Sequence, residues 1–163
     1  MKTELQNQLV ASHPSIFREV NGIPDQTCMA FGIECGDGWH DLIETLCEQI
    51  DASVEWANRL FPDLKFGVVA VQVKEKYGSL RFYVDFIYDI NLEPHQMEKI
   101  SRFTQEINGM IRMVEALSAK TCETCGGSCS RNTQRLFPHA QCVTCAEVQE
   151  ANSQNSYFKE NHK

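Results

Sequence analysis

The sequence predicts an α+β fold in which a small antiparallel sheet is covered by two long helices and followed by a small cysteine-rich module. Three patterns predict it. Two long segments repeat apolar residues every three or four positions, two neighbouring segments alternate apolar and polar residues, and four cysteines form two pairs near the C-terminal end. We expect an α+β domain over residues 1–119, the cysteine-rich module over 120–150 and a flexible polar tail over 151–163.

The N-terminal part should begin with a short helical or irregular lead over Leu5–Val20. Residues 28–34 are short, apolar and typical of a strand. The Gly36–Gly38 segment then breaks the chain, and Asp37 is a candidate N-cap for a helix over residues 38–60. The apolar stripe of that helix consists of Trp39, Leu42, Ile43, Leu46, Cys47, Ile50 and Val54.

The clearest strand signal lies over residues 69–86 and predicts an antiparallel hairpin around the Tyr77–Ser79 turn. Alternation places a set of apolar side chains on one face and polar or small side chains on the other. The apolar set consists of Val69, Val71, Val73, Leu80, Phe82, Val84 and Phe86. With the segment at 28–34, the hairpin should complete a three-stranded sheet.

A second long helix should begin at Pro94, which suits the first position of a helix, and continue for about 24 residues. Its apolar positions are Met97, Ile100, Phe103, Ile107, Met110 or Ile111, Val114 and Leu117. The same spacing suits a seam with a partner helix. We expect burial against the protein's own sheet, because the sheet needs a cover.

The two C-x2-C pairs, Cys122/Cys125 and Cys142/Cys145, have the spacing of a four-thiolate zinc site. A closed set of four sulfurs leaves no open coordination position, so we expect one structural Zn²⁺ in a zinc-ribbon or treble-clef arrangement. Redox pairs or an iron–sulfur cluster are the alternatives. Two further residues, Cys129 and His139, are possible substitute ligands. The remaining cysteines, Cys28, Cys35, Cys47 and Cys129, are interpreted as small buried hydrophobes.

Charge and composition narrow the class of partner. The net charge is −7, and residues 1–119 hold ten Lys/Arg against eighteen Asp/Glu. Binding to a phosphate backbone usually requires a basic face, so the balance favours a protein partner or a small ligand over nucleic acid. The polar N-terminus and the absence of a long apolar run predict a protein without a signal peptide or membrane span, located in a reducing cytoplasm.

Two small basic groups are candidate binding residues. In the cysteine-rich module, Arg131 and Arg135 could contact nucleic acid together with Lys120. On the hairpin, Lys74, Lys76 and Arg81 form a charged face that could bind a partner. In both cases ordinary solvated charges explain the same residues.

The case for an enzyme depends on a single cluster. Asp37, His40 and Asp41 lie close together in the sequence and could form a catalytic or metal-binding site, although such residues also cap helices and complement the helix dipole. The chain contains no phosphate-binding loop, dinucleotide fingerprint or H-E-x-x-H motif. We therefore expect no enzymatic activity.

Three strings resemble, in the same order, a group of short proteins from tailed bacteriophages, prophages and some bacteria. They are FGIECGDGWHDLI from Phe31, VQVKEKYGSLRFYV from Val71 and TCETCG from Thr121. The resemblance covers about residues 17–147 and implies a phage accessory protein in the cytoplasm of a bacterial host. From the acidic charge, the closed metal site and the absence of a catalytic constellation, we expect it to act by binding a host protein and to inhibit a defence or regulatory factor. A nucleic-acid-binding zinc ribbon is the alternative function.

Overall fold

The computed structural model describes residues 1–89, 93–132 and 138–160, and for residues 131, 132 and 153–160 the description is of the backbone. The chain is α+β, as predicted. In order along the chain, the elements are α1 (Thr3–Ser12), β1 (Ile33–Glu34), α2 (His40–Leu60), β2 (Gly67–Glu75), β3 (Leu80–Ile87), α3 (Pro94–Ser118), β4 (Arg131–Asn132), β5 (His139–Ala140) and α4 (Val143–Glu160). Short 3-10 helices cover Cys28–Phe31, Asp37–Trp39 and Pro62–Leu64.

The main sheet has three strands in the order β1-β2-β3, but it is mixed, so the prediction of an antiparallel sheet is wrong in this respect. The hairpin β2–β3 is antiparallel, whereas β1 pairs in parallel with β2 through Ile33 and Val73. The chain leaves β1, passes through α2 and returns as β2, and such a crossover through a helix gives parallel strands. Most of the segment predicted as a strand, Cys28–Phe31, is a 3-10 helix instead.

A β-bulge in β2 changes which side chains face the core. Ala70 pairs with Val84, but the next pair joins Gln72 to Tyr83, so Val71 is an extra residue. The predicted alternation of Val69, Val71 and Val73 is therefore wrong, because a one-residue insertion reverses the two faces of a strand. The β2 residues opposite the inward side chains of β3 are Val68, Ala70 and Val73.

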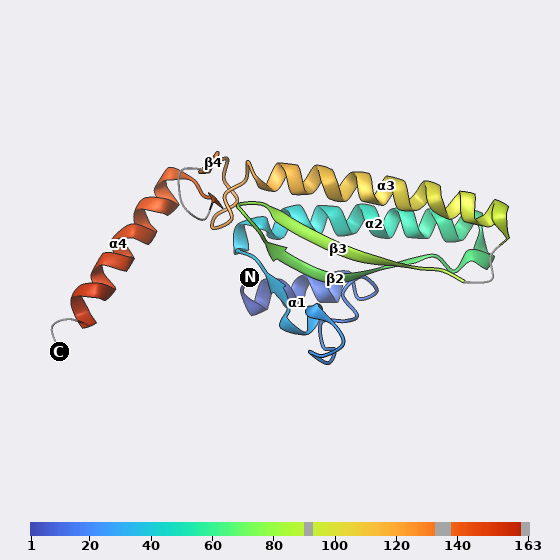
Figure 1. Cartoon of the computed structure of the whole chain (residues 1–163), viewed down its shortest axis with the longest axis horizontal. Coiled ribbons are helices and arrows are strands. Elements are labelled where there is room, and N and C mark those ends of the chain that lie inside the picture. Colours follow the sequence, from blue (N-terminus) through green and yellow to red (C-terminus); the bar gives the residue numbers. More distant parts are fainter. Residues whose placement is uncertain (90–92, 133–137, 161–163) are drawn as a thin grey trace.

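The helices α2 and α3 lie side by side along the hairpin, with α2 packed on β2 and α3 on β3 (Figure 1). Their inward stripes follow the predicted spacing at most positions, as the buried Ile50 of α2 and Ile107 of α3 illustrate. Met97 and Leu117, at the two ends of the stripe predicted for α3, are exposed, so their predicted burial is wrong. The α3 helix begins at Pro94, as predicted. The side chains and main chains of Glu93 and Gln96 close a reciprocal capping box there.

The N-terminal helix α1 lies beside β1 and reaches α2. The side chain of Gln6 accepts a hydrogen bond from the Ile33 amide at 2.8 Å. At the C-terminal end of α1, the buried His13 places Nδ1 2.6 Å from Asp51 Oδ2 of α2. The Ile16 carbonyl then accepts a hydrogen bond from the Ala70 amide at 2.8 Å. The segment that follows α1 therefore also covers the edge of β2 that β1 leaves free.

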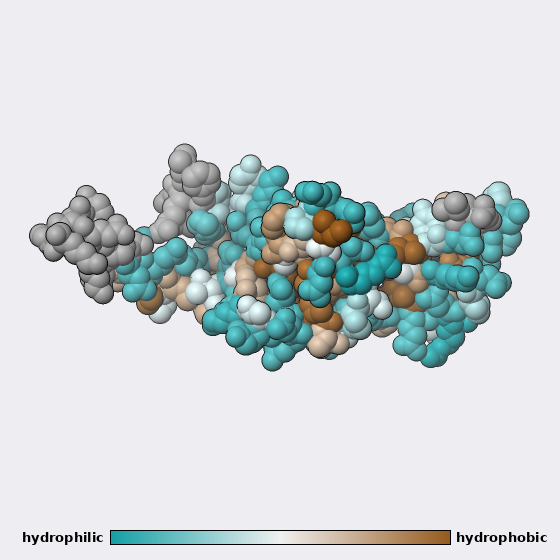
Figure 2. Space-filling model, turned by 90° about the horizontal axis from the view of Figure 1, so that it is seen from below, coloured by the Kyte–Doolittle hydropathy of each residue, from teal (hydrophilic) through white to brown (hydrophobic). Residues whose placement is uncertain are grey.

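The last helix, α4, projects away from the sheet and the other helices (Figure 1). It extends through residues 151–160, most of the segment predicted as a flexible polar tail, and residues 161–163 lie outside the described part. Its apolar side chains Val143 and Val148 are exposed. Seen from the side on which α1 lies, the surface is mainly hydrophilic and its hydrophobic patches are separate (Figure 2).

Candidate metal centre

The first cysteine pair lies on a tight loop that follows α3. The Gly126 amide donates to the Cys122 carbonyl at 2.8 Å, and the Cys122 amide donates to the Gly127 carbonyl at 2.7 Å. These hydrogen bonds fold residues 122–127 into a knuckle that carries both sulfurs. Gly126 has a φ of +75°, a conformation that favours glycine, so this residue allows the turn that closes the knuckle.

The second pair lies at the start of α4. The Cys142 carbonyl accepts the first hydrogen bond of the helix, from Ala146 at 3.0 Å, so Cys142 occupies the N-cap position and Cys145 lies in the first turn. The amide groups at a helix N-terminus favour negative charge, which suits a metal–thiolate group at this position.

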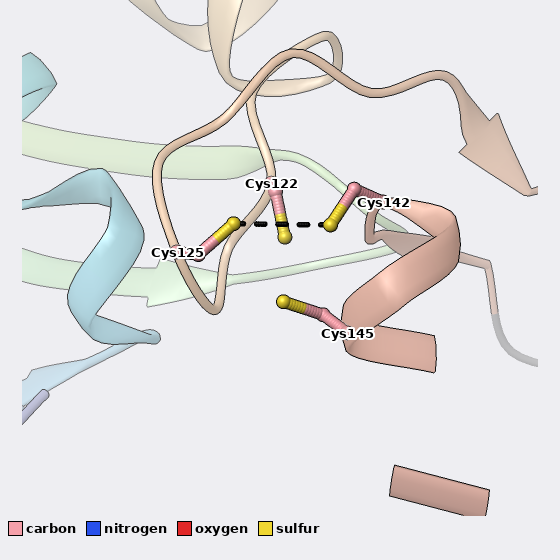
Figure 3. A group of neighbouring side chains, drawn as sticks. All are labelled: Cys122, Cys125, Cys142 and Cys145. Atoms are coloured by element: carbon pink, nitrogen blue, oxygen red, sulfur yellow. Dashed lines mark hydrogen bonds between the residues drawn. The ribbon is translucent and has the colours of Figure 1, made fainter. Parts of the chain in front are cut away.

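The four predicted sulfurs converge on one point (Figure 3). All four sulfur atoms lie within 4.8 Å of one another, and Cys125 Sγ is 3.8 Å from Cys142 Sγ. A tetrahedral Zn²⁺ with Zn–S bonds of about 2.3 Å separates its ligands by about 3.8 Å. The four cysteines could therefore hold a metal ion, and they are the only such group among residues 1–89, 93–132 and 138–160.

The thiols of this cluster have very different acidities. Burial raises the pKa of Cys122, but main-chain hydrogen bonds from Cys142, Cys125 and Thr124 outweigh it and lower the pKa to about 6. Hydrogen bonds with the neighbouring sulfurs of Cys142 and Cys125 raise the pKa of Cys145 to about 12. Cys122 is therefore the sulfur at which a thiolate is favoured, and a metal bound at the cluster would displace the proton of Cys145.

The knuckle is seated on the segment that precedes α2. The Gly38 amide donates to the Glu123 carbonyl at 2.8 Å, and the Gly36 amide donates to the Glu123 carboxylate, also at 2.8 Å. A Cβ at Gly36 would overlap the Glu123 backbone, and one at Gly38 would overlap the backbone of the knuckle. The two glycines, which the sequence marked only as a chain break, provide close contact between two backbones.

Two possible substitute ligands, Cys129 and His139, are not members of the four-sulfur group. Cys35 and Cys47 are buried, as predicted, and burial raises the pKa of both thiols. Cys28 is exposed, so its interpretation as a buried hydrophobe is wrong. The short 3-10 helix that replaces the predicted strand places it at the surface.

The carboxylates of the Asp37, His40 and Asp41 cluster do not converge. The Asp37 carboxylate accepts a hydrogen bond from the Lys2 amide at 2.7 Å and pairs with the Lys2 ammonium at 2.8 Å, which lowers its pKa. It caps no helix, because the N-cap residue of the 3-10 helix there is Gly36. His40 Nδ1 lies 3.1 Å from the carboxylate of Asp41, which is fully exposed.

The predicted binding cations lie on separate elements. Lys74 and Arg81 are directly opposite each other on β2 and β3, and the Lys76 ammonium lies 5.5 Å from the centre of the Tyr77 ring in the turn. Like charges in opposite positions destabilise a sheet. For Arg131 the structure describes only the backbone, in β4, and Arg135 lies outside the described residues. Nucleic-acid contact by these two arginines stays a prediction.

Sequence reasoning missed a groove between α2 and α3. It has a volume of about 310 Å³ and is lined by Trp56, Leu60, Phe61, Lys99, Arg102, Phe103 and Glu106. The detectable signal was the pair Trp56 and Leu60, four residues apart on the polar side of a helix whose apolar stripe is already complete without them.

No protein-family model matches the chain, and neither the curated proteins nor the solved structures contain a match. Among the described residues, no helix combines the length and the apolar character that crossing a bilayer requires.

Proposed function

We propose that this protein acts by binding another protein and that it has no catalytic activity of its own. In this proposal a structural Zn²⁺ holds the C-terminal module, and the outer surface of α2 and α3 is the binding surface. The exposed apolar groove between these helices is the observation that carries the proposal.

The identity and role of the metal are argued from the donor set. Four thiolates are the soft ligands that Zn²⁺ accepts in closed structural sites, and they occupy every position of a tetrahedron. A substrate or a reactive water would need an open position. The metal is therefore structural, and we expect no catalytic reaction at this centre.

The binding surface is argued from exposed side chains. Trp56 is 53% exposed and Leu60 46% exposed on α2, while Met113 is 59% exposed and Leu117 46% exposed on α3. Large apolar side chains scattered singly on a surface are ordinary, but neighbouring ones that line a groove, as Trp56 and Leu60 do, are typical of an interface. Tryptophan and methionine are also enriched in protein interfaces.

The resemblance to phage proteins supplies the proposed setting. In a bacterial cytoplasm the partner would be a host protein, and occupying a defence or regulatory factor would be the consequence of binding. The acidic balance of the chain supports a protein partner over nucleic acid. A nucleic-acid-binding zinc ribbon remains the alternative.

Affinity capture from bacterial lysate tests the proposal, with and without nuclease, for the wild type and two variants. Trp56→Asp alters the groove, and Tyr83→Asp is its matched control at an exposed aromatic residue of β3. We expect a stoichiometric protein partner that survives nuclease, is lost with Trp56→Asp and is kept with Tyr83→Asp. Recovery of nucleic acid, with protein partners that disappear on nuclease treatment, would favour the alternative.

A further inference from the structure

We infer that the α2–α3 groove binds an amphipathic helix of another protein, in which carboxylates flank the apolar residues. This inference rests on the proposed function. The inference depends on the position of the groove between two helices, on the side chains that line it and on two cations, Lys99 and Arg102, that form no ion pair with another described residue. It specifies the chemistry of the partner segment.

The position of the groove, between two adjacent helices, suits a third helix. By helical geometry Lys99, Arg102, Glu106, Met113 and Leu117 project from one side of α3. The Ser53 hydroxyl of α2 donates a hydrogen bond to the Glu106 carboxylate at 2.9 Å and so joins the two helices. The 25-residue α3 is about 37 Å long. A furrow between two adjacent helices accepts the apolar face of a third.

The base of the groove is apolar and aromatic. Phe103 is buried beneath it, and Trp56 and Leu60 form one wall with about half of their surface exposed. Tryptophan and arginine dominate the binding energy of many interfaces when a partner covers them. We therefore expect Trp56 to be the main anchor of the bound helix.

The charges on the other wall determine the partner's chemistry. The Lys99 ammonium lies 4.2 Å from the centre of the Phe61 ring, and neither Lys99 nor Arg102 forms an ion pair with another described residue. By contrast, Arg59 on the neighbouring helix pairs with Glu55 at 3.1 Å. A partner that covered these two cations with apolar groups would desolvate them, and the carboxylate that lines the groove, Glu106, already accepts a hydrogen bond from Ser53, so complementary carboxylates are expected from the partner.

A second copy of this chain fits the groove less well. In a symmetric antiparallel pair, Lys99 and Arg102 of one copy would face the Met113 and Leu117 end of the other, where the stripe is apolar. The cations would then be buried opposite methionine and leucine. Two chains of net charge −7 also repel each other, which further favours a different protein as the occupant.

Selection from a displayed library of helical peptides tests the inference. The peptides carry leucine at positions i, i+3, i+4 and i+7, and their other positions are randomised among Glu, Gln and Lys. Selection uses the full-length, zinc-loaded protein, and Trp56→Ala serves for counter-selection. Arg102→Glu removes one cation from the groove, and Arg112→Glu is the matched control at an exposed arginine of α3 that does not line it.

We expect the selected peptides to require Trp56, to shift its emission to shorter wavelength and to favour Glu over Lys beside the leucines by at least tenfold. Arg102→Glu should weaken their binding at least tenfold, whereas Arg112→Glu should leave it within twofold. Trp39 is fully buried, so the spectral change reports on Trp56.

Three results would overturn the inference. Trp56-dependent peptides without a charge preference, or equal losses from Arg102→Glu and Arg112→Glu, would show that carboxylates are not selected, and the proposed function would stand. A dimer of the protein alone that Trp56→Ala dissociates would assign the groove to a second copy. A library without any Trp56-dependent peptide would exclude a helical occupant. The proposed function itself fails separately, if the partner captured from lysate still binds Trp56→Asp.

Discussion

The indole N–H of Trp39 donates a hydrogen bond to the main-chain carbonyl of Thr121 at 2.8 Å. Trp39 is fully buried immediately before α2, and Thr121 is the residue before the first cysteine of the metal centre. This bond, together with the contacts of Gly36 and Gly38 with Glu123, ties the cysteine-rich module to the sheet and helices. The module is therefore packed as part of the fold, and a change on either side of this contact should disturb the other side.

Replacing Trp39 with Phe tests this bond. Phenylalanine fills most of the same space but has no N–H, so the Thr121 carbonyl loses its donor. We expect the free energy of unfolding to fall by about 1–3 kcal/mol, the usual cost of an unsatisfied buried polar group. Urea unfolding followed by circular dichroism measures it. Trp56→Phe, at an exposed tryptophan, should change stability by less than about 0.5 kcal/mol; equal losses in the two variants would contradict the role of the bond.

Replacing Gly38 with Ala should displace the knuckle. The added Cβ would overlap the Cys122 carbonyl and the Gly126 amide, and backbone cannot move aside as a flexible side chain can. Amide hydrogen exchange over residues 121–129 should become at least tenfold faster. Gly109→Ala is the control, because its Cβ would meet only the Arg112 guanidinium at 4.0 Å. It should stabilise α3 by about 0.5–1 kcal/mol. Unchanged exchange in Gly38→Ala would refute the close contact.

The metal assignment predicts one zinc per chain. Cys142→Ser removes one of the four sulfurs and should reduce the bound zinc, measured by plasma mass spectrometry, to a small fraction of the wild-type value. It should also release the 121–129 segment for exchange while the sheet and helices stay folded, because none of the four cysteines belongs to their core. Cys129→Ser should keep its zinc. If it loses the metal as well, the ligand set must be revised.

The buried thiols predict a loss of stability at alkaline pH. Burial raises the pKa of Cys35 from 9.0 to about 12, and it raises the pKa of Cys47 as well. Above pH 9 the unfolded chain therefore releases a proton that the folded chain retains, so stability is complete below pH 9 and falls as the pH rises. Each such thiol contributes a slope of about 1.4 kcal/mol per pH unit.

Urea unfolding of zinc-loaded Cys35→Ser, measured from pH 7 to pH 11, checks this expectation. The variant should lose stability less steeply than the wild type above pH 9. A constant difference between the two proteins at every pH would instead indicate a packing effect alone.

The parts of this fold that sequence could predict are those with a short-range signature. The stripe through Ile43 and Ile50 identified α2, Pro94 identified the start of α3, and the spacing of Cys122 and Cys125 identified half of the metal centre. In each case the residues that carry the signal lie within a few turns of one another. Local periodicity or spacing is then enough to predict the structure.

The parts that sequence could not predict depend on contacts between distant residues. The bulge at Val71 leaves no mark in a run of valines, yet it changes the face on which every later residue of β2 lies. The role of Gly36 becomes visible only with Glu123 in place, 87 residues later. The groove could not be predicted from the sequence for a similar reason, because Trp56 and Arg102 belong to different helices.

The distance in sequence between Trp39 and Thr121 has a consequence for synthesis. The two residues are 82 positions apart, so at about 5–20 residues per second the ribosome makes the second one roughly 4–16 s after the first. Throughout this interval the indole N–H and the two glycine amides of the nascent chain lack their hydrogen-bond acceptors, because those acceptors have not yet been made. The last of the four cysteines, Cys145, follows later still. If the cluster holds zinc as we propose, a chain translated without zinc ends with its sheet and helices assembled and this contact unmade. Such a chain would offer proteases and chaperones an internal surface that the finished molecule hides.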